Sequence, residues 1–148
     1  MNLPSPTLLT TTLPALALLA FGAPLLRRAR RSAAWPRTPG TILEARVVRQ
    51  GNASSPRLTY RYRLGAEGRV GHRLWVGPSS VAVTGDWADG VVARYPVGAT
   101  VQVAVDPDDP AYAVLEPGPR ALHWLLLVVA AAMLVVGVLI GLVAGAAA

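Results

Sequence analysis

The stretch Arg57–Leu64, RLTYRYRL, decides the fold of the central part of the chain. Every second residue in it is apolar or aromatic: Leu58, Tyr60, Tyr62 and Leu64. The residues between them are polar, and three are arginines: Arg57, Arg61 and Arg63. Because a β-strand sends successive side chains to opposite faces of its sheet, this alternation predicts a strand with one face on a core and an arginine face in water.

Further strand signals lie on both sides of this stretch. Runs rich in β-branched residues predict strands over Thr41–Arg49 and Thr100–Val105. Shorter strands are expected over His72–Val76 and Tyr112–Leu115. Glycines make Gly65–Gly71 a hairpin loop, and Pro107 and Pro110 make a rigid turn.

One segment has helical periodicity. Trp87, Val91 and Tyr95 are four residues apart and form an apolar stripe. Asp86 is placed to cap the first turn, and Pro96 ends the run. The central region is thus expected to be a small antiparallel sheet or barrel-like domain of about five strands and one short helix.

Two apolar segments flank this region. Leu8–Leu26 has nineteen residues without a charge, and Leu122–Ala144 has twenty-three. At 1.5 Å per residue, each approaches or exceeds the roughly 30 Å of a bilayer's hydrocarbon core. A cleaved signal peptide is the alternative for the first, but Met1–Thr7 lacks the expected positive charge.

The predicted class is therefore a membrane protein of α+β type, with two transmembrane helices flanking the β-rich domain. The expected divisions are a tail (1–7), a first membrane helix with a basic exit (8–31), the soluble domain (32–120), a second membrane helix (121–145) and a tail (146–148).

Arginine placement predicts the orientation. Four arginines follow the first span directly, Arg120 precedes the second, and neither terminus carries Lys or Arg outside the spans. The four are Arg27, Arg28, Arg30 and Arg31. The positive-inside rule then places the central domain in the cytoplasm, and Trp35 and Trp124 are expected at the membrane interface. The use of Arg without Lys, with much Ala, Gly and Pro, is typical of a GC-rich bacterial coding bias. Together with the two spans it predicts a multi-pass protein of a bacterial inner membrane.

The composition excludes several kinds of site and partner. The chain has no cysteine, which excludes disulfides, thiol catalysis and cysteine-ligated metals. Its net charge is +6, but residues 32–120 hold ten Arg against eight Asp and Glu, a balance of only +2. A nucleic-acid partner is therefore not expected.

Short motifs along the central region support a family assignment. They are WPxTPGTI at 35–42, YxYxL at 60–64, YPVG at 95–98, VxV at 101–103, DPxxP at 106–110 and AVLE at 113–116. Together they resemble the bacterial membrane family catalogued as domain of unknown function 3592. The resemblance implies the layout of span, β insert and span, and no activity. Val105 departs from it, since an aromatic residue often stands before the Asp-Pro turn.

No constellation of catalytic or metal-binding residues stands out. Asp106, Asp108, Asp109 and Glu116 cluster, but prolines interrupt them and the glycine of a calcium loop is absent. The segment 77–81 (GPSSV) lacks the second glycine of a nucleophile elbow, and His72 would have to join it. We expect no catalytic residue, no metal and no cofactor.

Two surfaces remain as candidates for interaction. Gly137, Gly141 and Gly145 share one face of the second apolar helix, where they favour close packing against another helix. That helix is the chain's own first span or a second copy, unless the spacing arises by chance. The arginine face is the possible binding face, for anionic lipid headgroups or an acidic protein, unless it only solvates the sheet.

These patterns favour a non-catalytic membrane protein whose β-rich domain is an interaction or scaffolding module. Its expected partners are the lipid bilayer and a protein, or itself through the second span. The alternative is a ligand-sensing or complex-assembly module on the outer side, with the opposite topology. A membrane-bound hydrolase is the least favoured class.

Overall fold

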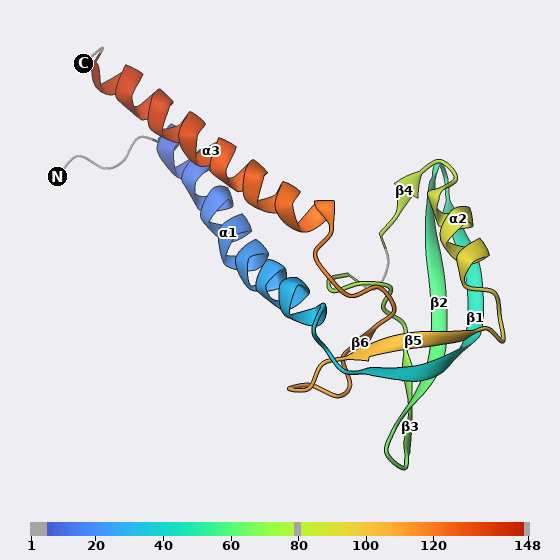
Figure 1. Ribbon diagram of the computed structural model, residues 1–148. Coiled ribbons are helices and arrows are strands. Elements are labelled where there is room, and N and C mark those ends of the chain that lie inside the picture. Colours follow the sequence, from blue (N-terminus) through green and yellow to red (C-terminus); the bar gives the residue numbers. More distant parts are fainter. Residues whose placement is uncertain (1–5, 79–80, 147–148) are drawn as a thin grey trace. The chain divides into compact units, whose positions relative to one another are not determined.

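The computed structural model describes residues 6–78 and 81–146, except for the side chains of 6–11 and 144–146 (Figure 1). The chain divides into two compact units. One is the sheet domain, Ala29–Gly118, and the other is a helical unit formed by the chain before and after it.

The sheet domain contains six antiparallel strands: β1 (Arg37–Gln50), β2 (Ala53–Leu64), β3 (Glu67–Gly71), β4 (Val83–Thr84), β5 (Thr100–Val105) and β6 (Ala113–Val114). Their order is β3-β2-β1-β5-β6, and β4 pairs with β2. The predicted strand over His72–Val76 is wrong. Gly65 has φ +59° and turns the chain at once, so the third strand forms within the residues predicted as a loop.

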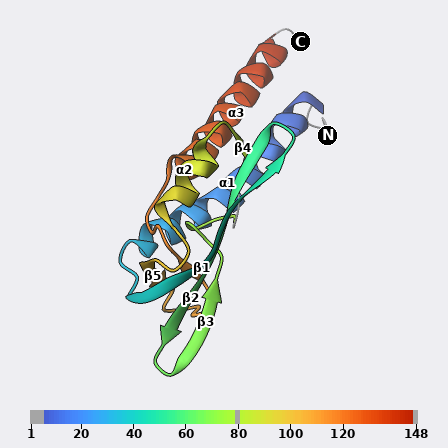
Figure 2. The same cartoon turned by 90° about the vertical axis from the view of Figure 1, so that its right-hand side faces the viewer.

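A β-bulge bends the longest strand. Ile42 pairs with Tyr60 but Glu44 pairs with Thr59, which leaves Leu43 as an extra residue in β1. Before the bulge β1 runs beside β5, and after it β1 pairs with β2 alone. Figure 1 shows this change of direction, and Figures 1 and 2 both show the β2–β3 hairpin extending beyond β1.

The sheet is open, so the barrel-like expectation is wrong. Beyond Gly71 the chain meets β6 only through an isolated bridge between Arg73 and Val114 and neighbouring hydrogen bonds. In one of these, the Glu116 N–H donates to the Leu74 carbonyl at 2.6 Å. Because β6 is two residues long, it offers too little edge to close the sheet.

The core lies against the inner face of the sheet. Helix α2 (Trp87–Arg94) covers β1 and β2 and buries Ala88 and Val91, which confirms the predicted helix. Asp86 occupies the N-cap position but makes no side-chain capping bond, so that part of the prediction is wrong. The largest fully buried side chains include Tyr60, Tyr62 and Ile42.

The helical unit contains α1 (Pro6–Ser32), whose last turns reach the sheet domain, and α3 (Ala121–Ala146). In α3, Ala121–Val143 is long and apolar enough to cross a membrane. The predicted first span lies within α1, and the side chains of its residues 8–11 lie outside the described part. The described residues therefore show one candidate span and not the predicted two.

Small residues bring α1 and α3 together. A Cβ atom added to Gly22 of α1 would lie 3.4 Å from Leu127 and 3.5 Å from Leu126 of α3. Gly137 is buried and Gly141 half-buried, while the surroundings of Gly145 lie outside the described side chains. Gly22, which no spacing pattern marked, is thus a close-packing glycine between the two helices.

The buried hydroxyl of Ser32 links the two points where the chain enters and leaves the sheet domain. Ser32 donates to the Ala29 carbonyl at 2.7 Å and accepts from the Gly118 N–H at 2.8 Å. An exposed ion pair between Arg31 and Asp108, at 2.9 Å, lies in the same domain. The end of α1 and the segment that precedes α3 are therefore held side by side at Ser32.

Gly71 gives a test of how the core packs around Tyr60. A Cβ atom at Gly71 would overlap the Tyr60 ring, and the ring cannot move within the core. Gly71→Ala should lower the free energy of unfolding by about 1–3 kcal/mol, the usual cost of overpacking. Thermal unfolding of the full chain in detergent, followed by circular dichroism, measures the change.

Gly68→Ala is the matched control on the same strand. Its added Cβ meets nothing within 4 Å, so stability should stay the same or rise slightly. Equal losses in the two variants would contradict the packing of Gly71 on Tyr60.

Candidate basic binding face

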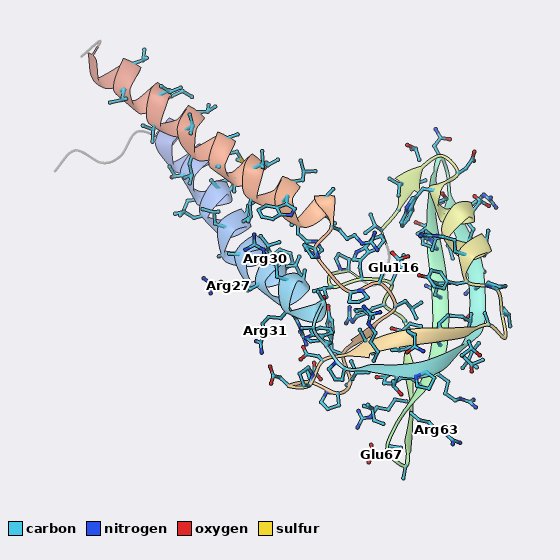
Figure 3. All side chains as sticks on the ribbon, in the orientation of Figure 1. Arg27, Arg30, Arg31, Arg63, Glu67 and Glu116 are labelled. Carbon is cyan, nitrogen blue, oxygen red and sulfur yellow. The ribbon has the colours of Figure 1, made fainter. Side chains whose placement is uncertain are left out.

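The predicted alternation of β2 is confirmed. Leu58, Tyr60 and Tyr62 are at most 3% exposed, and Leu64 is half-buried. Arg57, Arg61 and Arg63 are exposed on the opposite face, and we call these three residues the arginine face. Arg63 projects from β2 near the β2–β3 hairpin (Figure 3).

The cross-strand neighbours of the arginine face are polar. Arg57 lies opposite Arg46 of β1, and Arg61 lies opposite Thr41, which in turn lies opposite Thr100 of β5. Arg46 is itself paired with Glu44, so the charge opposite Arg57 is compensated. The surface around the three arginines is therefore polar on each neighbouring strand.

Acidic residues are engaged elsewhere. Five ion pairs use other arginines: Arg31–Asp108, Arg46–Glu44, Arg49–Asp89, Arg69–Glu67 and Arg94–Glu116. Within residues 6–78 and 81–146, none of the three residues of the arginine face has an ion-pair partner. The face therefore keeps three uncompensated charges although the domain is nearly neutral.

A shallow hollow of about 310 Å³ lies on this face. Its lining includes the side chains of Arg61, Arg63, Thr41 and Thr100. Guanidinium groups bind carboxylates and phosphates through paired N–H donors, and threonine hydroxyls add further donors. The arrangement can bind an anionic group, and it contains no nucleophile paired with a base.

The interior behind this face is anchored by tyrosines. The Tyr60 hydroxyl lies 2.9 Å from the Arg73 carbonyl and 2.8 Å from the Ala113 carbonyl. The Tyr62 hydroxyl donates to the Pro110 carbonyl at 3.1 Å. Burial raises the pKa of Tyr60 far above its usual value, and burial also raises that of Tyr62 against the opposing charge of Arg69.

The acidic and histidine candidates do not assemble into a reactive site. Asp106 is buried, and its carboxylate accepts from the Asp108 N–H at 3.0 Å, which stabilises its own turn. His72 is exposed, and its Nδ1 lies 3.2 Å from the Thr59 hydroxyl. Ser79 and Ser80 lie outside the described residues. In the part that is described, no three His, Asp or Glu side chains are grouped to hold a metal ion.

The residues expected at the membrane interface divide into two groups. Trp35 is buried and packs edge-on against Tyr112, with ring centroids 6.0 Å apart, so it is a packing residue of the sheet domain. The others lie at the ends of the two long helices: Arg27, Arg28, Arg30, Arg31, Arg120 and Trp124. Figure 3 shows Arg27, Arg30 and Arg31 along the last turns of α1, and Trp124 is 46% exposed.

Comparison with known proteins gives one match. The model of a family described as "Domain of unknown function (DUF3592)" matches residues 38–120. The match covers β1 to β6 and α2. No curated protein and no solved structure matches the chain.

The raised pKa of Tyr60 predicts a loss of stability in alkali. Unfolded chains release the phenolic proton near pH 10, whereas the folded protein retains it, so stability falls as pH rises above about 10. Tyr60→Phe should reduce this slope, and it should also cost about 1–3 kcal/mol at neutral pH because a buried carbonyl loses its donor. Urea unfolding of the full chain between about pH 7 and 11 measures both effects. An alkaline slope unchanged by Tyr60→Phe would contradict this role.

Proposed function

This chain belongs to the DUF3592 family, and we propose that it is a non-catalytic, membrane-anchored binding protein. In this proposal the sheet domain presents the arginine face to an acidic protein partner. The observation that carries the proposal is the charge distribution, since five ion pairs engage the surrounding acids and leave Arg57, Arg61 and Arg63 uncompensated.

The anchor in this proposal is a helical hairpin in a bacterial inner membrane. Support comes from the apolar length of α3 and from the charge-free run Leu8–Leu26. Gly22 approaches Leu126 and Leu127 closely, which gives the two helices a tight van der Waals contact. Such contacts hold helices together in a membrane, where the hydrophobic effect does not. The four arginines at the end of α1 favour a cytoplasmic sheet domain.

An acidic protein suits the arginine face for chemical reasons. Guanidinium groups pair with carboxylates in a planar, two-bond geometry that fixes orientation as well as charge. The row of Arg61, Thr41 and Thr100 extends the polar surface across three strands, farther than a single ion needs. Uncompensated charge also raises the rate of encounter with an oppositely charged surface.

A charge-matched comparison tests the arginine face. With the full chain in nanodiscs of zwitterionic lipid, a fluorescent deca-glutamate peptide should bind at low salt. The double variant Arg61→Gln and Arg63→Gln should weaken binding by about tenfold or more, since each lost charged contact costs about 1 kcal/mol or more. Fluorescence anisotropy measures the affinity.

The control removes the same charge elsewhere. Arg49 and Arg69 are already paired with Asp89 and Glu67, so Arg49→Gln with Arg69→Gln should change the affinity little. Equal weakening in both double variants, or no peptide binding at all, would count against the proposal. Peptide binding that is abolished when anionic lipid is added to the nanodiscs would assign the face to the membrane instead.

Reporter fusions test the orientation. With a cytoplasmic sheet domain and two spans, the C-terminus lies outside, so alkaline phosphatase fused there should be active and a fluorescent protein fused there should be dark. Replacing Arg27, Arg28, Arg30 and Arg31 with Gln should shift some molecules to the opposite orientation. A bright fluorescent fusion on the unaltered chain would refute the two-span cytoplasmic topology.

A further inference from the structure

A second, larger cavity lies where the sheet is interrupted. β3 pairs with β2 from Leu64 to Tyr60, and β4 pairs with Ala53 and Ser54. Between them, residues 55–59 of β2 face β1 on one side and no described strand on the other. A cavity of about 490 Å³ lies at this gap, within the range of small-molecule sites.

The apolar part of the cavity lining comes from three segments. They are β2, the end of β3 and the chain entering β6, and they contribute Pro56, Leu58, Val70, Gly71, Ala111 and Ala113. Leu58 and Ala113 are buried core residues, so this part of the wall is fixed. Val70 is half-exposed at the rim. The cavity therefore offers an apolar surface large enough for a short hydrocarbon group.

Two arginines supply the positive charge. Arg57 is exposed and has no ion-pair partner among the described residues. Arg73 is held in position, because it donates to the Gly77 carbonyl at 3.1 Å and its guanidinium carbon lies 4.5 Å from the centre of the Tyr112 ring. A fixed guanidinium loses little freedom when it binds an anion.

The other polar groups that line the cavity do not pair with Arg57 or Arg73. The Thr59 hydroxyl lies 3.2 Å from His72 Nδ1 and 3.3 Å from a Glu44 carboxylate oxygen. The other Glu44 oxygen pairs with Arg46 at 2.5 Å, outside the lining. Glu44 is therefore engaged by Arg46, and no described carboxylate forms an ion pair with Arg57 or Arg73. The Thr59–His72 pair adds further hydrogen-bonding groups.

We propose that this cavity binds a small organic anion, with a phosphate or carboxylate head at Arg57 and Arg73 and a short apolar body against Leu58 and Val70. The head can belong to a soluble metabolite or to a lipid headgroup, which present the same chemistry. This site shares Arg57 with the arginine face, but Arg61 and Arg63, the two arginines tested for the acidic protein partner, do not line it.

Calorimetry on the full chain in zwitterionic nanodiscs tests the site with butyl phosphate, butyrate and inorganic phosphate. Butyl phosphate should bind more tightly than inorganic phosphate, because only the ester fills the apolar part. Arg57→Gln should weaken butyl phosphate binding by tenfold or more. Ala111→Leu, which fills the cavity without changing charge at an exposed position, should weaken it similarly.

Arg49→Gln is the charge-matched control, because Arg49 is exposed, is paired with Asp89 and lies outside the lining. It should leave the affinity unchanged. Equal loss in Arg57→Gln and Arg49→Gln, no effect of Ala111→Leu, or no binding of any probe would overturn the proposal. Deca-glutamate binding can persist in each of these cases, so the two proposals fail separately.

Nanodiscs containing phosphatidylglycerol distinguish the source of the anion. If the lipid headgroup occupies the cavity, butyl phosphate should bind at least several-fold more weakly than in zwitterionic nanodiscs, and Arg57→Gln should abolish this difference. If a soluble anion is the ligand, the affinity should be the same in both lipids.

Discussion

The structure depends on the hydroxyl of Tyr60, which ties together the two ends of a sheet that does not close. It lies within hydrogen-bonding distance of Arg73, just past β3, and of Ala113 in β6. A hydroxyl has one proton, so it donates to one of these carbonyls at a time. The chain past β3 meets β6 and the residues after it through one bridge and the hydrogen bonds beside it, and this buried phenol adds a contact on the interior side.

The same ring lies next to the point where β3 ends. Gly71 lies against the Tyr60 ring where a side chain would not fit, and β3 ends there. Beyond this point residues 55–59 of β2 have no described strand beside them on that side, and the cavity lies there. The closing contact and the need for glycine at position 71 thus both depend on one large polar side chain in β2, and the cavity begins next to that glycine.

Local patterns predicted much of this architecture, because they reflect which face of an element meets the core. RLTYRYRL gave the buried and exposed faces of β2, and Thr100–Val105 matches β5 residue for residue. Contacts between residues that are distant in sequence produce no local pattern of this kind. Trp35 lies beside an arginine cluster and so resembled an interface residue, but it packs on Tyr112. Leu43 gives no sign of a bulge, and no local pattern marks Arg73 as a cavity residue.

The cavity wall and the exits to the helices belong to one continuous hydrogen-bonded segment. Ala113 lines the cavity and accepts from Tyr60, and Glu116, three residues on, donates to Leu74. Gly118 then donates to the buried hydroxyl of Ser32, at the end of α1. Only two residues separate Gly118 from the start of α3. Hydrogen bonds therefore fix this segment at Ala113, Glu116 and Gly118, so the cavity wall and the Ser32 contact belong to one restrained stretch of the sheet domain.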